Sequence, residues 1–295
     1  MKPYDPRRWT SHLFDVTGSL VGEIFGRVVA SVAWSAIVVV CFLYGPQWCR
    51  HLSVPATAHS LVGAALGLLL VFRTNSSYDR FWEGRKQWGG IVNECRNLAR
   101  QTSVWIAADR SLMREIVGWT IAFPFTVMHL LQKSNQLPEV VNELPALERA
   151  KVEQSVHRPL AVARMITDRL LKARQQGLID GLQLSSIDQN VQLLIDYCGA
   201  CERIRSTPLP FAYAVHLRRV LIAYCFTLPL ALVKDFGWAT IPTTLLISYS
   251  MFGIEEIGVE IEDPFEGTLN DLPLEAICDK IASALSEIRE SPDLQ

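Results

Sequence analysis

The amino-acid sequence predicts an all-α integral membrane protein with four transmembrane helices and a large helical region outside the membrane. Three observations support this fold class. Apolar residues make up 49% of the chain and charged residues only 20%, where about 25% is usual for a soluble domain. The charged residues are absent from several long windows rather than thinly spread. Between these windows, apolar residues recur at helical spacing, and we find no convincing strand.

Four windows are candidate membrane spans, since a helix needs about 20 predominantly apolar residues to cross a bilayer. Three of them are uncharged over most of that length: residues 28–45, 56–72 and 236–254. The fourth, residues 220–233, is shorter. It is preceded by an apolar run at residues 208–217 that only Arg218 and Arg219 separate from it.

A fifth window, residues 116–131, contains Pro124 and His129 and fits either a short span or a helix buried in a protein core. The other four windows form two pairs along the chain, which favours a buried core helix for this fifth window. A short loop joins the first two, and only Lys234 and Asp235 separate the last two, which predicts a tight helical hairpin. Two hairpins give four spans and leave both termini on one side of the membrane.

The positive charges predict the orientation. Lys and Arg gather before residue 28, after residue 72 and before residue 220. The two hairpin loops, in contrast, carry only Arg50 and Lys234. By the positive-inside rule, both termini and the middle of the chain are cytoplasmic. The expected segments are an N-terminal cytoplasmic segment, a first hairpin, a helical cytoplasmic region, a second hairpin, an acidic segment with a helix, and a C-terminal tail: residues 1–23, 24–73, 74–207, 208–254, 255–280 and 281–295.

Several function classes are excluded by what the sequence lacks. A net charge of −2 and a pI of about 6.3 do not favour a nucleic-acid partner. There is no phosphate-binding glycine loop, no His-Glu-x-x-His motif and no nucleophile elbow. The number of cysteines, seven, is odd and argues against a disulfide framework. The cytoplasmic region is instead helical and amphipathic, as residues 144–174 show by their apolar spacing.

Metal or redox chemistry has little support in the sequence. Cys198 and Cys201 have the spacing of a redox or metal-ligand pair, but no second pair and no nearby histidine accompany them. Packing inside a helix explains both. His59 and His129 are interpreted as hydrogen-bonded or pore-lining groups rather than ligands. We therefore expect no cofactor and assign no metal site.

The second span has two interpretations. Gly63 and Gly67, with the alanines between them, suit close packing of helices in a membrane. Alternatively, Ala64, Leu68 and Phe72, spaced by four, form one stripe that would line a narrow apolar tube in an oligomer, and such a constriction can gate ions by dewetting. The spacing alone favours packing.

Two polar segments flank the membrane spans. Residues 72–89 are dense in Arg, Asp, Tyr and Trp, which fits an interfacial anchor or a network between subunits. Acidic residues gather at positions 255–271, where carboxylates and amide oxygens could bind a hard cation. The simpler interpretation, which we favour, is an acidic turn that caps helices or pairs with basic segments.

Taken together, three blocks of residues resemble the bestrophin family, in a bacterial form. The first contains Asn75, Tyr78, Asp79, Arg80, Trp82, Glu83 and Arg85, followed by Trp88 and Gly89. The second is Ser206-Thr-Pro-Leu-Pro210, before the second membrane pair, and the third runs from Ile261-Glu-Asp-Pro-Phe265 to Asn270-Asp-Leu-Pro-Leu274. The blocks follow in the family's order, and the resemblance covers about residues 5 to 280.

The resemblance implies a homopentameric ion channel in the bacterial inner membrane, with the second helix of each subunit lining the pore. Its partners would be other copies of itself, lipid and small monovalent ions. Counted back from Arg80, the three positions of the family's apolar neck are Phe72, Leu68 and Ala64. The family places a bulkier residue at the last of these, so we expect the restriction at Leu68 and Phe72.

Animal members of the family are calcium-activated chloride channels, and the resemblance places their calcium clasp at Asp263, Glu266, Asn270 and Asp271. Thr268 stands where one coordinating carboxylate is expected. Losing a charged ligand weakens calcium binding. We therefore expect a degenerate clasp and a channel that calcium does not gate.

The family also has a cytoplasmic aperture, for which Leu182 or Leu184 is the candidate here. Cation and anion conduction both remain open, because an apolar neck carries no charge. Two alternatives to a channel remain. One is a membrane enzyme acting on lipid or prenyl phosphates, although no second aspartate-rich motif is present; the other is a non-conducting scaffold.

Overall fold

The computed structural model describes residues 20–133 and 144–290, and all regular structure in these ranges is helical. The all-α prediction is confirmed for this part of the chain. The expected N-terminal segment up to residue 19 and the last five residues of the expected tail lie outside the described ranges. The chain divides into two compact units. We name residues 20–81 and 208–263 the hairpin unit, and the remaining described residues the bundle unit.

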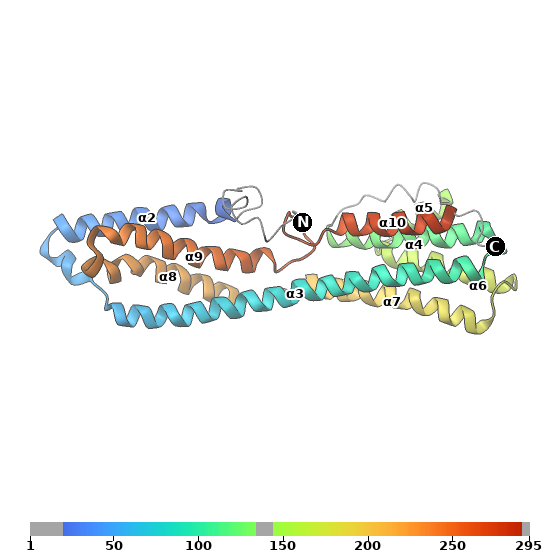
Figure 1. Ribbon diagram of the computed structural model, residues 1–295, viewed down its shortest axis with the longest axis horizontal. Coiled ribbons are helices and arrows are strands. Elements are labelled where there is room, and N and C mark those ends of the chain that lie inside the picture. The colour runs from blue at the N-terminus through green and yellow to red at the C-terminus, as the bar shows by residue number, and fades with distance from the viewer. Residues whose placement is uncertain (1–19, 134–143, 291–295) are drawn as a thin grey trace. The chain divides into compact units, whose positions relative to one another are not determined.

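The hairpin unit contains the long apolar helices (Figure 1). Its elements are α2 (Val21–Tyr44), η1 (Gln47–Leu52), the first half of α3 (Ala56–Trp105), α8 (Phe211–Phe236), η3 (Gly237–Ala239) and α9 (Thr240–Glu260). Three stretches are long and apolar enough to cross a membrane: Val21–Tyr44, Ala56–Trp105 and Phe211–Glu260. The third stretch holds both α8 and α9, so four spans remain a prediction.

The turn between α8 and α9 lies later than the sequence indicated. Lys234 and Asp235, the predicted hairpin, belong to α8, and the chain turns at Gly237, whose φ is 49°. Only glycine adopts such a backbone angle at little cost. Similarly, α9 continues through Glu260, so Glu255 and Glu256 lie within the helix rather than after it.

One face of α3 holds the hairpin unit together. Leu66 and Leu70 are each 1% exposed and pack in a core with residues of α2, α8 and α9: Ile24, Val28, Leu217, Leu221, Leu228 and Phe252. Gly63 lies on the same face, where a Cβ atom would stand 2.6 Å from the hydroxyl oxygen of Tyr224. The buried face of α3 therefore follows a spacing of three and four residues, as a helix packed on one side requires.

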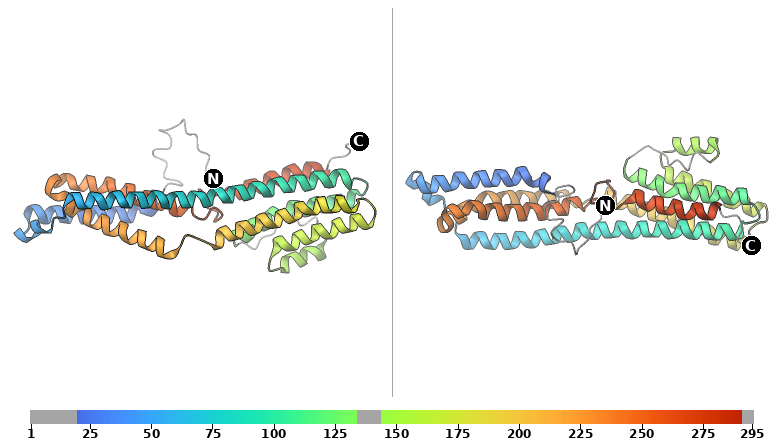
Figure 2. Two further views of the ribbon diagram at one scale, coloured as in Figure 1. Left: turned by 90° about the horizontal axis from the view of Figure 1, so that it is seen from below. Right: turned by 45° about the horizontal axis from the view of Figure 1, so that its top comes forward.

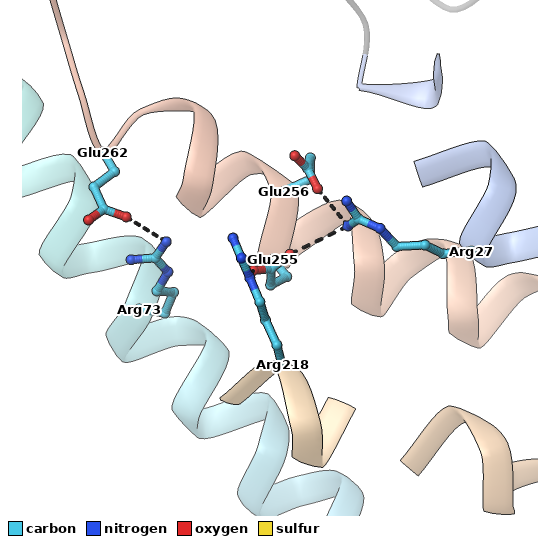
Figure 3. A network of polar contacts seen from close by, with 6 residues as sticks. All are labelled: Arg27, Arg73, Arg218, Glu255, Glu256 and Glu262. Carbon is cyan, nitrogen blue, oxygen red and sulfur yellow. Dashed lines mark hydrogen bonds and ion pairs between the residues drawn. The ribbon is translucent and has the colours of Figure 1, made fainter. Parts of the chain in front are cut away.

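Beside this core, charged side chains pair across helices (Figure 3). Arg27 of α2 donates to Glu256 of α9 at 2.6 Å, and Arg218 of α8 donates to Glu255 at 3.0 Å. Both carboxylates are buried, at 8% and 3% exposure. In an apolar helix unit a buried carboxylate is stable only when it is paired. The acidic residues of α9 thus bind the basic residues of α2 and α8.

A second pair joins α3 to the chain that follows α9. Arg73 is 2% exposed, and its Nη2 donates to Glu262 Oε2 at 2.7 Å. The other oxygen of Glu262 accepts from the backbone amide of Leu209 at 2.8 Å. Arg80 Nε donates to the backbone carbonyl of Glu262 at 3.0 Å. The side chain and the backbone carbonyl of Glu262, which follows α9, therefore bind α3 and the residue Leu209 just before α8.

The bundle unit is an assembly of helices (Figure 2). Besides the second half of α3, it contains α4 (Arg110–Leu131), α5 (Ala146–Gln154), α6 (Arg158–Gln175), α7 (Gly181–Ser206) and α10 (Leu274–Glu290). Helix α4 is buried along most of its length, as Ile116, Trp119 and Phe123 show at 0% exposure, and it packs against α6, α7 and α10. The fifth apolar window is thus a core helix of the bundle unit.

The apolar spacing of residues 144–174 corresponds to two helices. Helix α5 ends at Gln154, and α6 begins at Arg158 with His157 as its N-cap. The C-terminal tail does not begin at residue 281. Helix α10 continues through Glu290, and its residues Ile281 and Leu285 are both 0% exposed, so an apolar stripe keeps this segment folded against the bundle.

The packing of α3 against α7 predicts the effect of one methyl group. A Cβ atom on Gly90 would lie 2.5 to 2.7 Å from ring atoms of Tyr197, whereas Gly199 of α7 has no atom within 4 Å of such a Cβ. Gly90→Ala should therefore destabilise the protein by about 1–3 kcal/mol. Gly199→Ala, the matched control in an exposed helix position, should be neutral or stabilise it by about 0.5–1 kcal/mol. Thermal midpoints in detergent that fall equally for both variants would contradict this packing.

The pairing of Arg73 predicts a larger effect. Glu262→Gln keeps the size of the side chain but leaves the buried guanidinium without a counter-charge, which should cost about 3–5 kcal/mol. Asp168→Asn is the control, because Asp168 pairs with Arg164 on the surface of α6, where both side chains are more than half exposed, and such pairs contribute about 0–1 kcal/mol. Thermal unfolding of the purified protein measures both changes, and equal midpoints would refute a stabilising role for the pair.

Candidate ion pathway

The three predicted neck residues lie on the face of α3 opposite the core. Leu68 and Phe72 are 56% and 55% exposed, and Ala64 is exposed as well. The buried residues Leu66 and Leu70 alternate with them along the helix. Phe72 therefore points away from the hairpin unit, while its neighbour Arg73 points into it. The outward stripe is about 12 Å long at 1.5 Å per residue.

The packing interpretation of the second span is supported on one face of α3, whereas the opposite face contacts nothing in the protomer at Gly67. Gly63 packs closely against Tyr224, as helix packing through small residues requires. A Cβ atom added to Gly67 would meet no atom within 4 Å, so its small size is not used for packing in the protomer. The apolar stripe of Ala64, Leu68 and Phe72 is left for lipid or another copy of the chain.

The family-signature residues beyond Phe72 fall into two groups. Five are exposed along α3: Asn75, Tyr78, Asp79, Trp82 and Arg85. The others make contacts inside the protomer. Arg80 binds the carbonyl of Glu262, and Glu83 accepts from Lys86 at 2.6 Å and from Gln87. The hydrogen bond from Lys86, followed by that from Gln87, lowers the pKa of Glu83, so this side chain carries a negative charge at neutral pH. The structure therefore does not bring all seven residues into one network within a single chain.

The signature residue Trp88, and Gly84 between the signature residues Glu83 and Arg85, are part of the bundle core. Trp88 is 0% exposed. Gly84 lies against the proline and phenylalanine of the third block, since a Cβ atom there would stand 2.9 Å from the Phe265 ring and 3.0 Å from Pro264. The first and third sequence blocks thus meet in the bundle unit, which explains why they occur together.

The predicted calcium clasp is organised around a backbone contact. Asp271 is 1% exposed, and its Oδ2 accepts from the amides of Gly267 and Thr268 at 2.8 and 2.7 Å. Glu266, in contrast, is exposed, and Asn270 and Asp263 are partly buried. The two backbone hydrogen bonds to Oδ2 fix the orientation of this carboxylate within the loop. The loop is therefore held by its own amides.

The two aperture candidates differ in exposure. Leu182 stands in the first turn of α7 and is 83% exposed, whereas Leu184 is partly buried. The start of α7 is determined by a capping box, in which Asp180 accepts from the amide of Gln183 and the Gln183 side chain accepts from the amide of Asp180. Of the two leucines, Leu182 is the one available to line an opening.

The remaining sequence candidates are buried, except His129, which is partly buried. Cys198 and Cys201 are 1% and 0% exposed, and burial raises the pKa of the Cys201 thiol to about 12. Burial also lowers the pKa of His129 on α4, which keeps this ring neutral. His59 stacks on Tyr224 with ring centroids 4.2 Å apart. Sequence reasoning missed the partners of the acidic residues, since Arg27 and Glu256 are 229 positions apart and no local pattern links them.

Comparison with proteins of known sequence shows close relatives over nearly the whole chain. A voltage-dependent anion channel-forming protein of Nostoc is 37% identical over 98% of this chain and 94% of its own length. A protein of the same description from Synechocystis is 38% identical over 97% of this chain and 94% of its own length. Another, YneE of Escherichia coli K12, is 29% identical over 98% and 94%, respectively.

Solved structures agree with these relatives in fold. The crystal structure of a bacterial bestrophin homologue from Klebsiella pneumoniae matches with a TM-score of 0.85 at 29% identity, covering 92% of this chain and all of the other. The helical architecture described above is therefore bestrophin-like. The family model for bacterial and fungal bestrophin proteins matches residues 2–287. With its motifs, its helical hairpin unit and these matches in agreement, the chain belongs to the bestrophin family of membrane proteins.

Proposed function

We propose that this protein is a homopentameric channel for small monovalent ions, with α3 of each subunit lining the pore. That it is an ion channel, and not an enzyme on lipid or prenyl phosphates, follows from its family. The observation that supports the pore is the outward stripe of Ala64, Leu68 and Phe72, opposite the packed face of the same helix.

An apolar neck controls conduction by water content rather than by charge. Five copies of the stripe around one axis would form a tube about 12 Å long with no polar group of a side chain in it. Such a constriction gates by dewetting, so ions pass when it widens enough to hold water. Because Ala64 is small, Leu68 and Phe72 determine the narrowest part. Leu182 is the proposed second aperture, with Leu184 as its partly buried neighbour.

The sign of the conducted ion depends on groups outside the neck. The relatives named above carry the description of anion channels, which makes chloride the first ion to test. Asp79, seven residues beyond Phe72, is exposed on the same side of α3 and would place a carboxylate ring near the pore, a feature that favours cations. We also propose that the protein lies in the bacterial inner membrane. Both termini would be cytoplasmic, because Lys and Arg gather on their side of the spans.

A reversal potential measured across a salt gradient in a planar bilayer tests conduction and ion sign together. The shift of the potential toward the chloride or the cation equilibrium value identifies the permeant ion. The mass of the detergent-solubilised protein, corrected for bound detergent, tests the pentamer. A monomeric mass without any current would support the scaffold alternative instead.

Substitution in the stripe should change conduction directly. Phe72→Ala removes the bulkiest neck side chain, so the tube widens, holds water more often and passes a larger current at the same voltage. Val62→Ala is the control, because Val62 is 49% exposed but lies about 120° around the helix from Leu68. Single-channel recordings should show the increase for Phe72→Ala only. An equal response of the two variants would place the pore elsewhere.

Calcium should leave conduction unchanged. Asp271 is engaged by two backbone amides, and Thr268 supplies no carboxylate. Flux from liposomes in millimolar calcium and in a calcium chelator should therefore agree within error. A several-fold rise of flux with calcium would show that the loop binds the ion after all.

A further inference from the structure

The fold brings together three side chains that the sequence keeps apart. His157 stands at the N-terminus of α6, and Cys198 and Glu202 lie one turn apart on α7. One possible ligand atom from each residue, an imidazole nitrogen, the thiol sulfur and a carboxylate oxygen, lies within 4.8 Å of the other two. The missing histidine that made a metal role for Cys198 unattractive in the sequence is thus supplied by a neighbouring helix.

We propose that His157, Cys198 and Glu202 form a zinc-binding site in the bundle unit. Imidazole, thiolate and carboxylate are the ligands that zinc takes in proteins, at about 2.0–2.3 Å from the metal. A thiolate with an imidazole selects zinc over calcium or magnesium, which prefer oxygen ligands alone. The three residues leave a fourth tetrahedral position for water. This proposal does not depend on the pore or on the number of subunits.

The burial of the three side chains suits a site that is filled from the surface. Cys198 lies at the bottom, 1% exposed, while the His157 and Glu202 side chains are 34% and 39% exposed. An open cavity of about 710 Å³ lies beside His157 and is lined also by Ser155 and Leu160. The two outer side chains can therefore rotate toward an ion that the buried sulfur anchors.

Without a metal, the same residues are stable in another arrangement. His157 Nδ1 accepts from the amide of Leu160 at 3.1 Å, and Nε2 lies 3.4 Å from Glu202 Oε2. Because Nδ1 accepts a hydrogen bond, the ring carries a proton on Nε2. Burial raises the pKa of the Cys198 thiol, which is protonated and unreactive. The proximity of a metal ion favours the thiolate strongly enough to reverse this.

Binding of zinc therefore requires a defined exchange of protons. The thiol proton leaves to solvent, and the sulfur coordinates the metal. The ring proton moves from Nε2 to Nδ1, so that Nε2 coordinates and the cap to the Leu160 amide is given up. The zinc ion would then tie the start of α6 to the C-terminal half of α7 in place of one hydrogen bond.

The test uses the full-length, metal-stripped protein in detergent, with Zn²⁺ in calorimetry and Co²⁺ as a spectroscopic substitute. The expected result is one ion per chain, a tetrahedral Co²⁺ spectrum with a thiolate charge-transfer band, and a thermal midpoint that rises with zinc. Cys198→Ala and Glu202→Gln should each weaken binding about 100-fold or more, since ligands contribute at least as much as their outer-shell partners. Cys201→Ala, one turn away and outside the site, should bind normally.

A histidine variant separates the ligand from the helix cap. His157→Asn retains a side-chain acceptor for the Leu160 amide but removes the imidazole, so the protein should remain folded and lose zinc binding. Glu202→Gln is a surface change that gives a folded variant in any case. Absence of zinc binding in the native protein, binding that survives Cys198→Ala or His157→Asn, or a Co²⁺ complex without thiolate absorption would each overturn the site.

Discussion

The pairing of three arginines with carboxylates at and just after the end of α9 is the interaction on which the rest of the hairpin unit depends. The unit is built from helices that are apolar on nearly every side, so their packing alone does not determine how far one helix slides along another. Arg27, Arg73 and Arg218 belong to three different helices. Arg27 pairs with Glu255 and Glu256, Arg218 with Glu255, and Arg73 with Glu262. A displacement by one turn would leave buried charges unpaired, and that penalty determines the register.

This register also determines which residues face outward. Arg73 is directed inward to Glu262, and Leu66 and Leu70 are directed inward by the core. The opposite face, with Leu68 and Phe72, is then necessarily exposed in the protomer. The apolar stripe assigned to the pore is therefore a consequence of the charge pairing on the other side of α3, although the two features share no residue.

Much of the fold could be predicted from the sequence, because the absence of charge over the length of a bilayer is a strong signal. The stripe of Ala64, Leu68 and Phe72 could be proposed from its spacing of four residues.

The features that could not be predicted have a physical cause in common: they depend on tertiary packing. Residues 116–131 have the composition of a membrane span yet form the core helix α4, since a protein interior and a lipid tail are equally apolar. The ion pairs between the three arginines and the glutamates, and the proximity of His157 to Cys198, could not be predicted, because these residues meet only through tertiary packing. The length of α10 was underestimated because its charged residues obscure the stripe of Ile281 and Leu285.

The unbroken course of α3 from Ala56 to Trp105 constrains how this family can change in evolution. Each residue of an α-helix turns the next by about 100°. Inserting or deleting one residue between Leu66 and Leu70 would therefore rotate one of them out of the packed face of the hairpin unit. The same holds between Gly84 and Trp88 in the bundle unit. Seven residues together would restore the rotation to within about 20°, but would lengthen the helix by about 10 Å. Within each unit, the packed part of α3 therefore accepts substitutions at exposed positions more readily than insertions or deletions.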